Sequence, residues 1–410
     1  MLDEGFYSDL DARLEAADER VTRLYPGDRG TRQPVHTVYV PANQEIVGVV
    51  PRWGAQARAT FAEHVGGNAQ VAEVFGICVP PEVVARVLAK LETEPVEDLR
   101  IDFEDGYGWP NSGEEDADAD AAAAALSEAI ERGEAAPFVG LRCKGMGLET
   151  RRRGIRTVDV FLSSLLERVD LPAGFVVTLP KVVAVEHVAA FAGVLNALEQ
   201  EYGLPTGRLR FEVQVETPQA VLSPDGTVAL SAIIAAADGR CAGLHFGTYD
   251  YGTALGVPAA AQSLAHPAAD LAKGLMQVAV AGTGIRLSDG SSNVLPVGDA
   301  DAIHAAWHEH TRLVRRSLER GFYQGWDLHP NQLPSRYLAT FGYFAAALPG
   351  AADRLRAYVE QQMSGTLDEP ATAQALARFL LRGLDCGALD HRDVTARTTL
   401  DRAGLQRYAG

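Results

Sequence analysis

The sequence has few cysteines, and none of them forms a recognisable pattern. Its 410 residues include four, Cys78, Cys143, Cys241 and Cys386, which lie far apart and contain no Cys-x-x-Cys pair. Structural zinc sites need closely spaced ligands, and disulfide scaffolds are dense in cysteine. The spacing therefore excludes both classes and predicts buried free thiols in a reducing cytoplasm.

Long apolar runs and an excess of positive charge are also missing. No apolar stretch approaches the roughly 20 residues of a membrane span, and the acidic segment Met1–Gly5 lacks the apolar core of a secretory signal. The 37 basic residues are outnumbered by 54 acidic ones, giving a net charge of −17, whereas nucleic acid and anionic membranes need local positive charge. We therefore expect a cytoplasmic protein whose main partner is neither nucleic acid nor a membrane.

What the sequence does contain is a regular alternation of short β-rich runs and helical intervals. The runs are 36–41, 99–105, 138–143, 174–181, 209–216, 243–247, 285–289 and 325–330. Such alternation implies parallel strands joined by helical crossovers, and eight of them predict an α/β fold of the (β/α)8 (TIM) barrel type. A doubly wound open sheet is the alternative, but it predicts strands that are apolar on both faces.

The run from Leu209 to Glu216 has two unlike faces, because apolar and polar residues alternate along it. Run 99–105 alternates in the same way. A barrel interior can hold such polar faces if their charges pair, since an unpaired buried charge is costly. The residues expected to pair are Arg100, Asp102, Arg210 and Glu212. Pro218 ends the strand, which puts Glu216 at its last position.

The flanking regions are helical by pattern. Leu10, Leu14 and Ala17 follow helical spacing and predict an amphipathic N-terminal helix. The expected organisation is an N-terminal helical extension with a linker (1–34), a catalytic barrel (35–335) and a helical C-terminal arm (336–410). Breaks within the arm are expected at 348–351 and 365–370 because both segments contain Pro and Gly.

Charged and polar residues gather at the ends of the predicted strands, where the active site of such a barrel lies. They are Glu104, Asp105, Arg142, Lys181, Glu216, Asp250, Asp289 and His329. Carboxylates without nearby cysteine or histidine ligands suit Mg²⁺, or Mn²⁺, rather than zinc. Arg142 offers a planar fork for a carboxylate or enolate oxygen.

Several short segments at these strand ends, in this order along the chain, carry a resemblance to a known family. They are Val38–Pro41, Asp102–Asp105, Leu141–Cys143, Leu179–Lys181, Val215–Pro218, Phe246–Asp250, Ala281–Ile285 with Ser288–Gly290, and Gly321–Gln332. Over about residues 36–335, the set resembles the citrate lyase beta subunit / hydroxy-acid aldolase superfamily, with its malyl-CoA and citramalyl-CoA lyase relatives.

The resemblance implies a phosphoenolpyruvate/pyruvate-type barrel that makes or breaks carbon–carbon bonds with Mg²⁺. It implies that Glu216 and Asp250 bind the metal and that Arg142 polarises the substrate oxygen. Glu104 and Asp105 would hold the metal's waters from the outer shell. Of the remaining strand-end residues, it places His329 along the wall of the site.

The same resemblance implies a role for Asp390. The segment Gly387–Asp390 is similar to a Gly-x-x-Asp segment of an arm that, in the CoA lyases, covers a neighbouring subunit and supplies an acid–base Asp. The resemblance therefore implies a homo-oligomer, such as a trimer or a hexamer. It also implies Mg²⁺-dependent cleavage of a 2-oxo acid or a hydroxyacyl-CoA through an enolate, with CoA as part of the substrate left open. Asp390 or a metal-bound water would handle the hydroxyl proton.

Other interpretations of these residues stay open. Glu216 and Asp250 could cap the helices that follow them, and Arg142 could be an interior ion-pair partner of Asp102. Lys181 could form a Schiff base with a carbonyl substrate, or simply pair with carboxylates. The whole chain could also be a non-catalytic or accessory barrel that binds a carboxylate metabolite.

Two further clusters are ambiguous. The arginines at 151–153 and Arg156 could bind the phosphates of CoA, although a solvated charge run is the simpler interpretation. His304, His308 and His310 have a spacing that suggests zinc, but no further ligand is near, and we expect them on the surface of a helix outside the barrel.

Overall fold

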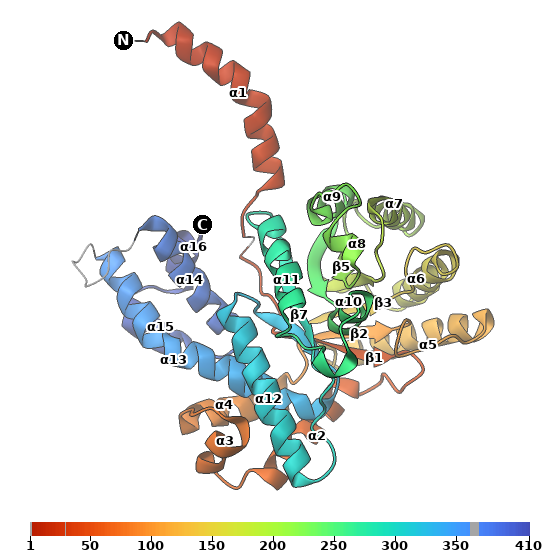
Figure 1. The fold of residues 1–410 in the computed structure, drawn as a ribbon, viewed down its shortest axis with the longest axis vertical. Helices are drawn as coiled ribbons and strands as arrows, with labels where there is room; N and C mark the ends of the chain where they lie inside the picture. Colours follow the sequence, from red (N-terminus) through yellow and green to blue (C-terminus); the bar gives the residue numbers. More distant parts are fainter. Residues whose placement is uncertain (1, 29, 361–368) are drawn as a thin grey trace.

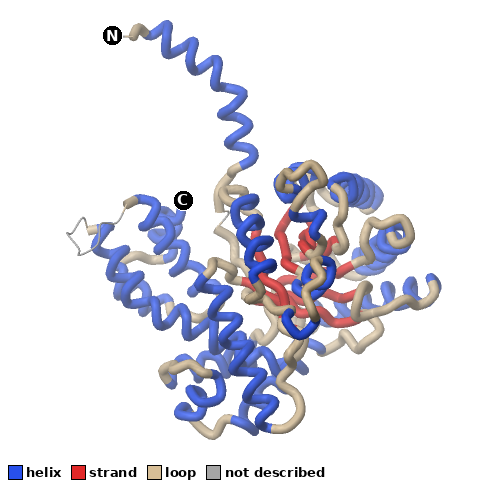
Figure 2. The backbone as a smooth tube through the Cα atoms, viewed as in Figure 1, coloured by secondary structure: helices blue, strands red, loops and turns tan. Residues whose placement is uncertain are grey.

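The barrel predicted from the alternation is present in the computed structural model, which describes residues 2–28, 30–360 and 369–410. Within these residues, eight parallel strands close into a barrel in the order β1 to β8, surrounded by helices (Figures 1 and 2). The strands are β1 (His36–Pro41), β2 (Asp98–Asp102), β3 (Phe138–Arg142), β4 (Phe175–Leu179), β5 (Arg210–Val215), β6 (Cys241–Phe246), β7 (Arg286–Ser291) and β8 (Gln324–Asp327).

Helices precede the barrel, connect its strands and follow it. The N-terminal helix is α1 (Glu4–Leu24). The crossovers contain α2 (Val49–His64), α3 (Asn68–Phe75), α4 (Pro81–Thr93), α5 (Ser112–Glu131), α6 (Arg151–Leu166), α7 (Val185–Glu201), α8 (Pro218–Val221), α9 (Ala229–Ala236), α10 (Thr248–Ala254), η1 (Ala259–Ala261), α11 (Pro267–Val280) and α12 (Ala300–Glu319). After β8 come η2 (Pro330–Gln332), α13 (Leu333–Val359), α14 (Pro370–Asp385), α15 (His391–Thr398) and α16 (Arg402–Ala409).

The two faces of β5 point where the alternation predicted. On the outer face, the ring of Phe211 packs edge-on against Phe191 of α7, with 5.3 Å between centroids. On the inner face, the Glu212 carboxylate binds Arg100 across the barrel, with 2.9 Å between Nη2 and Oε2, and both side chains are buried. The expected pairing of these two interior charges is confirmed, while Arg210 donates to the carbonyl oxygen of Cys241 (2.9 Å).

Several boundaries differ from the sequence-based expectation. β5 ends at Val215, one residue before Glu216, because Thr217 already serves as the N-cap of α8. α13 continues through Pro349 to Val359, so the break predicted at 348–351 is wrong. A proline removes one helical hydrogen bond, but α13 packs against α12, α14 and α15, which holds it together. Of the break predicted at 365–370, residues 365–368 lie outside the described residues.

A second hydrophobic core joins the C-terminal helices to the long first crossover. Tyr337 and Phe341 of α13 belong to the same buried cluster as Val87 and Leu91 of α4, separate from the cluster between the barrel and helices such as α5 to α7. The end of the chain therefore packs against the side of the barrel where β1 leads into α2. None of the described helices has both the length and the apolar character required for crossing a membrane.

Candidate functional site

A cavity of about 680 Å³ opens where the strands end. Its lining includes Pro41, Asp102, Arg142 and Ser291, which end β1, β2, β3 and β7 respectively. The carboxyl end of a (β/α)8 barrel is where its ligands bind, and this volume lies within the range of small-molecule pockets. The cavity is therefore the candidate ligand-binding site.

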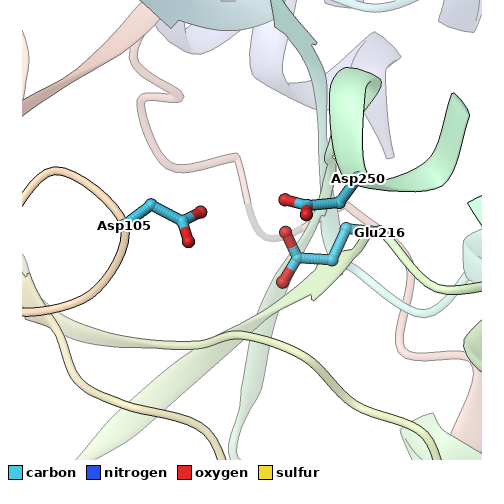
Figure 3. Close-up of side chains that lie close together, drawn as sticks. All are labelled: Asp105, Glu216 and Asp250. Atoms are coloured by element: carbon cyan, nitrogen blue, oxygen red, sulfur yellow. The ribbon is translucent and has the colours of Figure 1, made fainter. Parts of the chain in front are cut away.

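Three carboxylates converge at this cavity, and we call them the acidic cluster. They are Asp105 in the loop after β2, Glu216 directly after β5, and Asp250 in the first turn of α10 (Figure 3). One oxygen from each lies within 4.8 Å of the others. Glu216 is buried, whereas Asp105 and Asp250 are exposed. Glu216 does not cap the following helix, because the hydroxyl of Thr217 accepts the Ala220 N–H instead.

The ammonium group of Lys181 lies among these carboxylates. Its Nζ is 2.8 Å from Asp250, 3.2 Å from Asp105 and 3.2 Å from Glu216. The backbone N–H of Lys181 also donates to Glu216 Oε1, at 2.6 Å. Burial opposes protonation of this amine, but the carboxylates of Glu216, Glu104 and Asp250 hold the pKa of Lys181 above its ordinary range. A lysine kept protonated is a poor Schiff-base nucleophile.

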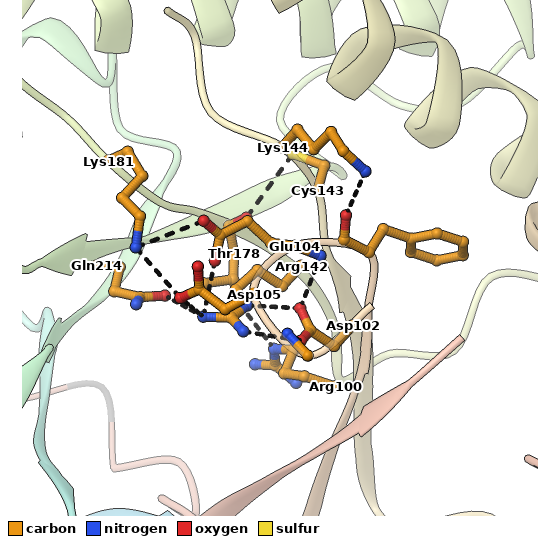
Figure 4. A network of polar contacts seen from close by, with 12 residues as sticks. Arg100, Asp102, Glu104, Asp105, Arg142, Cys143, Lys144, Thr178, Lys181 and Gln214 are labelled. Atoms are coloured by element: carbon orange, nitrogen blue, oxygen red, sulfur yellow. Dashed lines mark hydrogen bonds and ion pairs between the residues drawn. The ribbon is translucent and has the colours of Figure 1, made fainter. Parts of the chain in front are cut away.

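Arg142 is held by one neighbour and directed toward the cluster (Figure 4). Its Nε and Nη2 form a fork with the carboxylate of Asp102, at 2.6 and 2.8 Å, since the two residues are register neighbours on β2 and β3. The remaining nitrogen, Nη1, lies 3.1 Å from Glu104 and 3.3 Å from Gln214 Oε1. Arg142 is thus both an interior ion-pair partner and part of the cavity wall.

The carboxylates of the site perturb one another. Burial, together with the charges of Glu104 and Asp250, raises the pKa of Glu216 to about 8 against the opposing charge of Lys181. Burial raises the pKa of Glu104 to about 7, although Arg142 and Lys181 act in the other direction. Asp250 behaves differently. Burial would raise its pKa, but contact with the Lys181 ammonium lowers it.

The charge balance of the site favours a further cation. The acidic cluster, Asp102 and Glu104 supply five carboxylates against the two positive charges of Arg142 and Lys181. Fully ionised, the group carries a formal excess of three negative charges, which a partly buried site does not tolerate cheaply. All of the converging donors are carboxylate oxygens, the ligands preferred by Mg²⁺ and similar hard cations. The residues present therefore fit a divalent hard cation.

His329 lines the same cavity. The backbone N–H of Asn331 donates to its Nδ1 at 3.1 Å, and burial lowers the pKa of the His329 ring. The neutral ring must then carry its proton on Nε2. His329 therefore offers a hydrogen-bond donor to a ligand rather than a base.

Two predicted residues lie away from the cavity. Asp390 is the exposed N-cap of α15 and accepts the Arg392 N–H at 2.7 Å, and it is not part of the cavity lining. Asp289 was expected at the active face, which is wrong. Its buried carboxylate binds Lys273 (3.0 Å) and Ser317 (2.6 Å) on α11 and α12. Asp289 thus points out of the barrel toward the helices.

Aromatic side chains form a part of the cavity wall that was not predicted from the sequence. The rings of Tyr39 on β1 and Trp326 on β8 lie 4.7 Å apart, and the guanidinium of Arg142 stacks over Tyr39 at 4.8 Å. Trp53 of α2 also lines the cavity. Tyr39 and Trp326 lie in predicted strands that also carried the family resemblance. The alternation along those strands could have identified both side chains as inward-facing.

The two ambiguous clusters are partly exposed. Arg153 and Arg156 both pair with Asp116 on α5, and Arg151, Arg152 and Arg156 are exposed. The prediction that His310 lies on the surface is wrong. His310 is buried on the inner face of α12, where its Nδ1 lies 2.8 Å from the hydroxyl of Ser335. Within the described residues, the acidic cluster is the metal-type grouping that the structure brings together.

A family model described as "Domain of unknown function (DUF6986)" matches residues 14–410. The chain belongs to this family. A search of curated proteins gave no match for the DUF6986 chain.

Several solved structures are similar to it. One is the protein CitE from Mycobacterium tuberculosis in complex with magnesium and acetoacetate, 16% identical over 86% of this chain and 99% of that chain, with a TM-score of 0.47. Another is a magnesium/glyoxylate complex of Haloferax volcanii malate synthase, 16% identical over 93% and 98% of the two chains, with a TM-score of 0.48. A third is the citrate lyase beta subunit from M. tuberculosis complexed with oxaloacetate and magnesium, 18% identical over 76% and 98%, with a TM-score of 0.43. At these identities and scores, the chemistry of the DUF6986 chain has to follow from its own residues.

Proposed function

We propose that this DUF6986 chain is a Mg²⁺-dependent carbon–carbon lyase or aldolase that acts through an enolate on a 2-oxo acid or a hydroxyacyl-CoA. The observation that supports the proposal is the convergence of the acidic cluster, within 4.8 Å, at a cavity lined by Asp105, Asp250 and Arg142. The sequence resemblance to the citrate lyase beta / hydroxy-acid aldolase superfamily rests on the same residues.

The residues that would hold the metal are those of the acidic cluster. Glu216 and Asp250 were expected as ligands from the resemblance. Asp105, which the resemblance assigned to the outer shell, lies close enough to the other two to be a direct ligand as well. A bound Mg²⁺ would supply Lewis acidity toward the carboxylate and carbonyl oxygens of the substrate.

The chain's own contribution to the reaction centres on Arg142. Its Nη1 lies outside the fork with Asp102, so it is placed to donate a hydrogen bond to the substrate oxygen on which negative charge develops when the carbon–carbon bond breaks. Asp102 fixes the plane of the guanidinium, which removes the need for reorganisation during the reaction. Tyr39 and Trp326 exclude water from one side, and His329 supplies a hydrogen-bond donor from Nε2.

The proton of the substrate hydroxyl needs a separate acceptor, and Asp390 is our candidate. It lies outside this chain's own cavity lining, so the role requires the arm of a neighbouring subunit in a homo-oligomer. Asp390→Asn should then lower kcat at least about 100-fold, the lower end for loss of a general base. Asp393→Asn, an exposed change on the same helix, should leave kcat unaltered. Equal rates in the two variants would remove Asp390 from the mechanism.

A magnesium titration tests the metal centre without any substrate. Calorimetry on the wild type should show one site, and Glu216→Gln should lose measurable binding because the buried ligand is neutralised. Glu45→Gln is the matched control. It removes one charge at the mouth of the same cavity, from a side chain that is 76% exposed and paired with Arg52. An absence of binding in the wild type, or equal binding in all three proteins, would defeat the metal proposal.

Activity is tested by a spectrophotometric screen of malyl-CoA, citramalyl-CoA and 4-hydroxy-2-oxo acids, with and without Mg²⁺. Turnover that depends on Mg²⁺ and is lost in Glu216→Gln supports the lyase. Trapping of pyruvate on Lys181 by borohydride would instead point to Schiff-base chemistry. Magnesium binding without turnover of any of these compounds would favour the non-catalytic barrel.

A further inference from the structure

Helix α1 lies apart from the other elements of the part of the chain that the structure describes (Figure 1). It extends away from the barrel and from the C-terminal helices (Figure 1), and none of its 21 residues is buried. Isolated helices owe little of their stability to propensity alone and normally need packing of an apolar face. Large apolar side chains such as Leu14 and Val21 are nevertheless exposed along it. A helix of this kind is expected to pack against something outside the chain.

The apolar residues of α1 repeat at alternating steps of three and four. They are Tyr7, Leu10, Leu14, Ala17, Val21 and Leu24. This spacing places them at the a and d positions of a heptad repeat, the seam of a coiled coil. The stripe therefore matches a partner helix of the same type better than a broad groove, which would require a wider apolar face.

The charges beside this seam indicate the partner and its direction. The e positions hold Glu4, Asp11 and Asp18, and the g positions hold Arg13 and Arg20 after Phe6. In a parallel pair of identical helices, a g residue faces the e residue of the following heptad on the other helix, so Arg13 would meet the partner's Asp18. In an antiparallel pair, e would face e and g would face g, which would bring acid to acid and arginine to arginine. The pattern is complementary to itself only in the parallel arrangement.

We propose that α1 forms a two-stranded parallel coiled coil with α1 of a second copy of this chain. The point at which α1 joins the barrel allows such a pairing of two chains. The N–H of Gly27 donates to the carbonyl of Gly282 at 2.8 Å, just after α11 and before β7 begins at Arg286. That is the end of the barrel opposite the cavity. A coiled coil at this position joins two copies and leaves both cavities open.

Charge exchange in the full-length chain tests the pairing. Asp18→Arg places two arginines opposite each other, and Arg13→Asp places two aspartates opposite each other. Each variant alone should sediment at half the mass of the wild type, and the coiled coil by itself accounts for twice the 43.8 kDa of one chain. An equimolar mixture of the two variants should return to the wild-type mass, because both pairs between position 13 of one helix and position 18 of the other are again opposite in sign. Glu19→Arg makes the same charge change at an outward-facing f position and should keep the wild-type mass.

Direction is tested by a disulfide at the seam. Leu10→Cys, in a Cys78→Ser background that removes the exposed native thiol, should form an interchain disulfide on mild oxidation, because equivalent residues meet in a parallel pair. Ala12→Cys, at an f position, should not. A monomeric wild type, a mass of three chains, a mixture that stays dissociated or a missing Leu10→Cys disulfide would overturn the proposal. All the substituted α1 positions lie outside the folded body, and circular dichroism of each variant verifies that the barrel is intact.

Discussion

Replacing Arg142 by methionine should separate its structural role from its catalytic one. Arg142→Met removes the fork that binds Asp102, whose side chain is 2% exposed. That carboxylate would keep only the backbone N–H groups of Glu104 and Gly106, each at 3.0 Å. Removing one partner of a buried ion pair costs about 3–5 kcal/mol. The free energy of unfolding in urea should fall by that amount.

A second substitution removes the uncompensated charge. In Arg142→Met/Asp102→Asn the neutral amide can still accept from a backbone N–H, so the free energy of unfolding should recover to within about 2 kcal/mol of the wild type. The rate should not recover. Loss of one donor to a developing oxyanion lowers kcat by a factor on the order of 100 to 1,000, and this loss should be the same in the single and double variants.

Urea unfolding followed by circular dichroism gives the stability, and steady-state rates with the compound that the screen identifies give kcat. Magnesium affinity is the control. It should not fall in either variant, since Arg142 is positively charged and lies outside the acidic cluster. A double variant that regains kcat along with its stability would show that the guanidinium matters only through Asp102, and the proposed contact with the substrate oxygen would be refuted.

Three further predictions concern the charge, pH response and packing of the barrel. Lys181→Met should tighten Mg²⁺ binding by a factor on the order of ten, because the ammonium group of Lys181 no longer occupies the acidic cluster. Calorimetry measures this affinity, and unchanged or weaker binding would contradict the prediction. In a Glu104→Gln/Glu216→Gln background, which removes the two carboxyl groups of the site whose pKa is raised, acidification should lower stability in two steps. Burial lowers the pKa of His310, so the unfolded chain takes up its proton first, below about pH 6.5. Burial opposes ionisation of Asp327, but a neighbouring guanidinium and two histidines hold its pKa well below the usual range, so its contribution is lost at lower pH, below about 4. Urea unfolding at stepped pH would show constant stability from pH 7 to 3 if this were wrong. Gly140→Ala would place a Cβ 1.8 Å from a carbonyl oxygen of the neighbouring strand and should destabilise by about 3 kcal/mol or more, whereas Gly193→Ala on a helix with open space should not destabilise at all.

The barrel could be predicted from the sequence because its signals are local. In a strand the backbone alone decides which face a side chain takes, so the alternation at 209–216 already separated Phe211 from Glu212. The long helix α13 could not be predicted in the same way. Pro349 is a strong local signal for a break, and only the packing of α13 against neighbouring helices overrides it.

The side chains of the site were harder to predict from the sequence than the strands, because part of the site lies in loops. Glu104 and Asp105 follow β2 in a loop, where no period tells which side chain approaches Arg142 and which joins the acidic cluster. Asp289 lies on β7, where the pairing with β8 shifts register between Ser288 and Ser291. Asp289 was assigned to the active face because it ends the predicted run 285–289, but β7 continues to Ser291, and alternation places Asp289 on the same outer face as Leu287.

Backbone conformation offers independent support for the importance of Lys181. Among the described residues, three other than glycine have positive φ: Lys181 (54°), Asp238 (49°) and Thr399 (62°). Asp238 and Thr399 closely follow the ends of α9 and α15, where a left-handed residue is an ordinary way to end a helix. Lys181 follows a strand and has no such reason. Strained residues outside turns cluster at functional sites, and here both the N–H and the ammonium of the strained residue bind Glu216. The left-handed backbone of Lys181 thus accompanies two contacts that join this residue to the buried carboxylate of the acidic cluster.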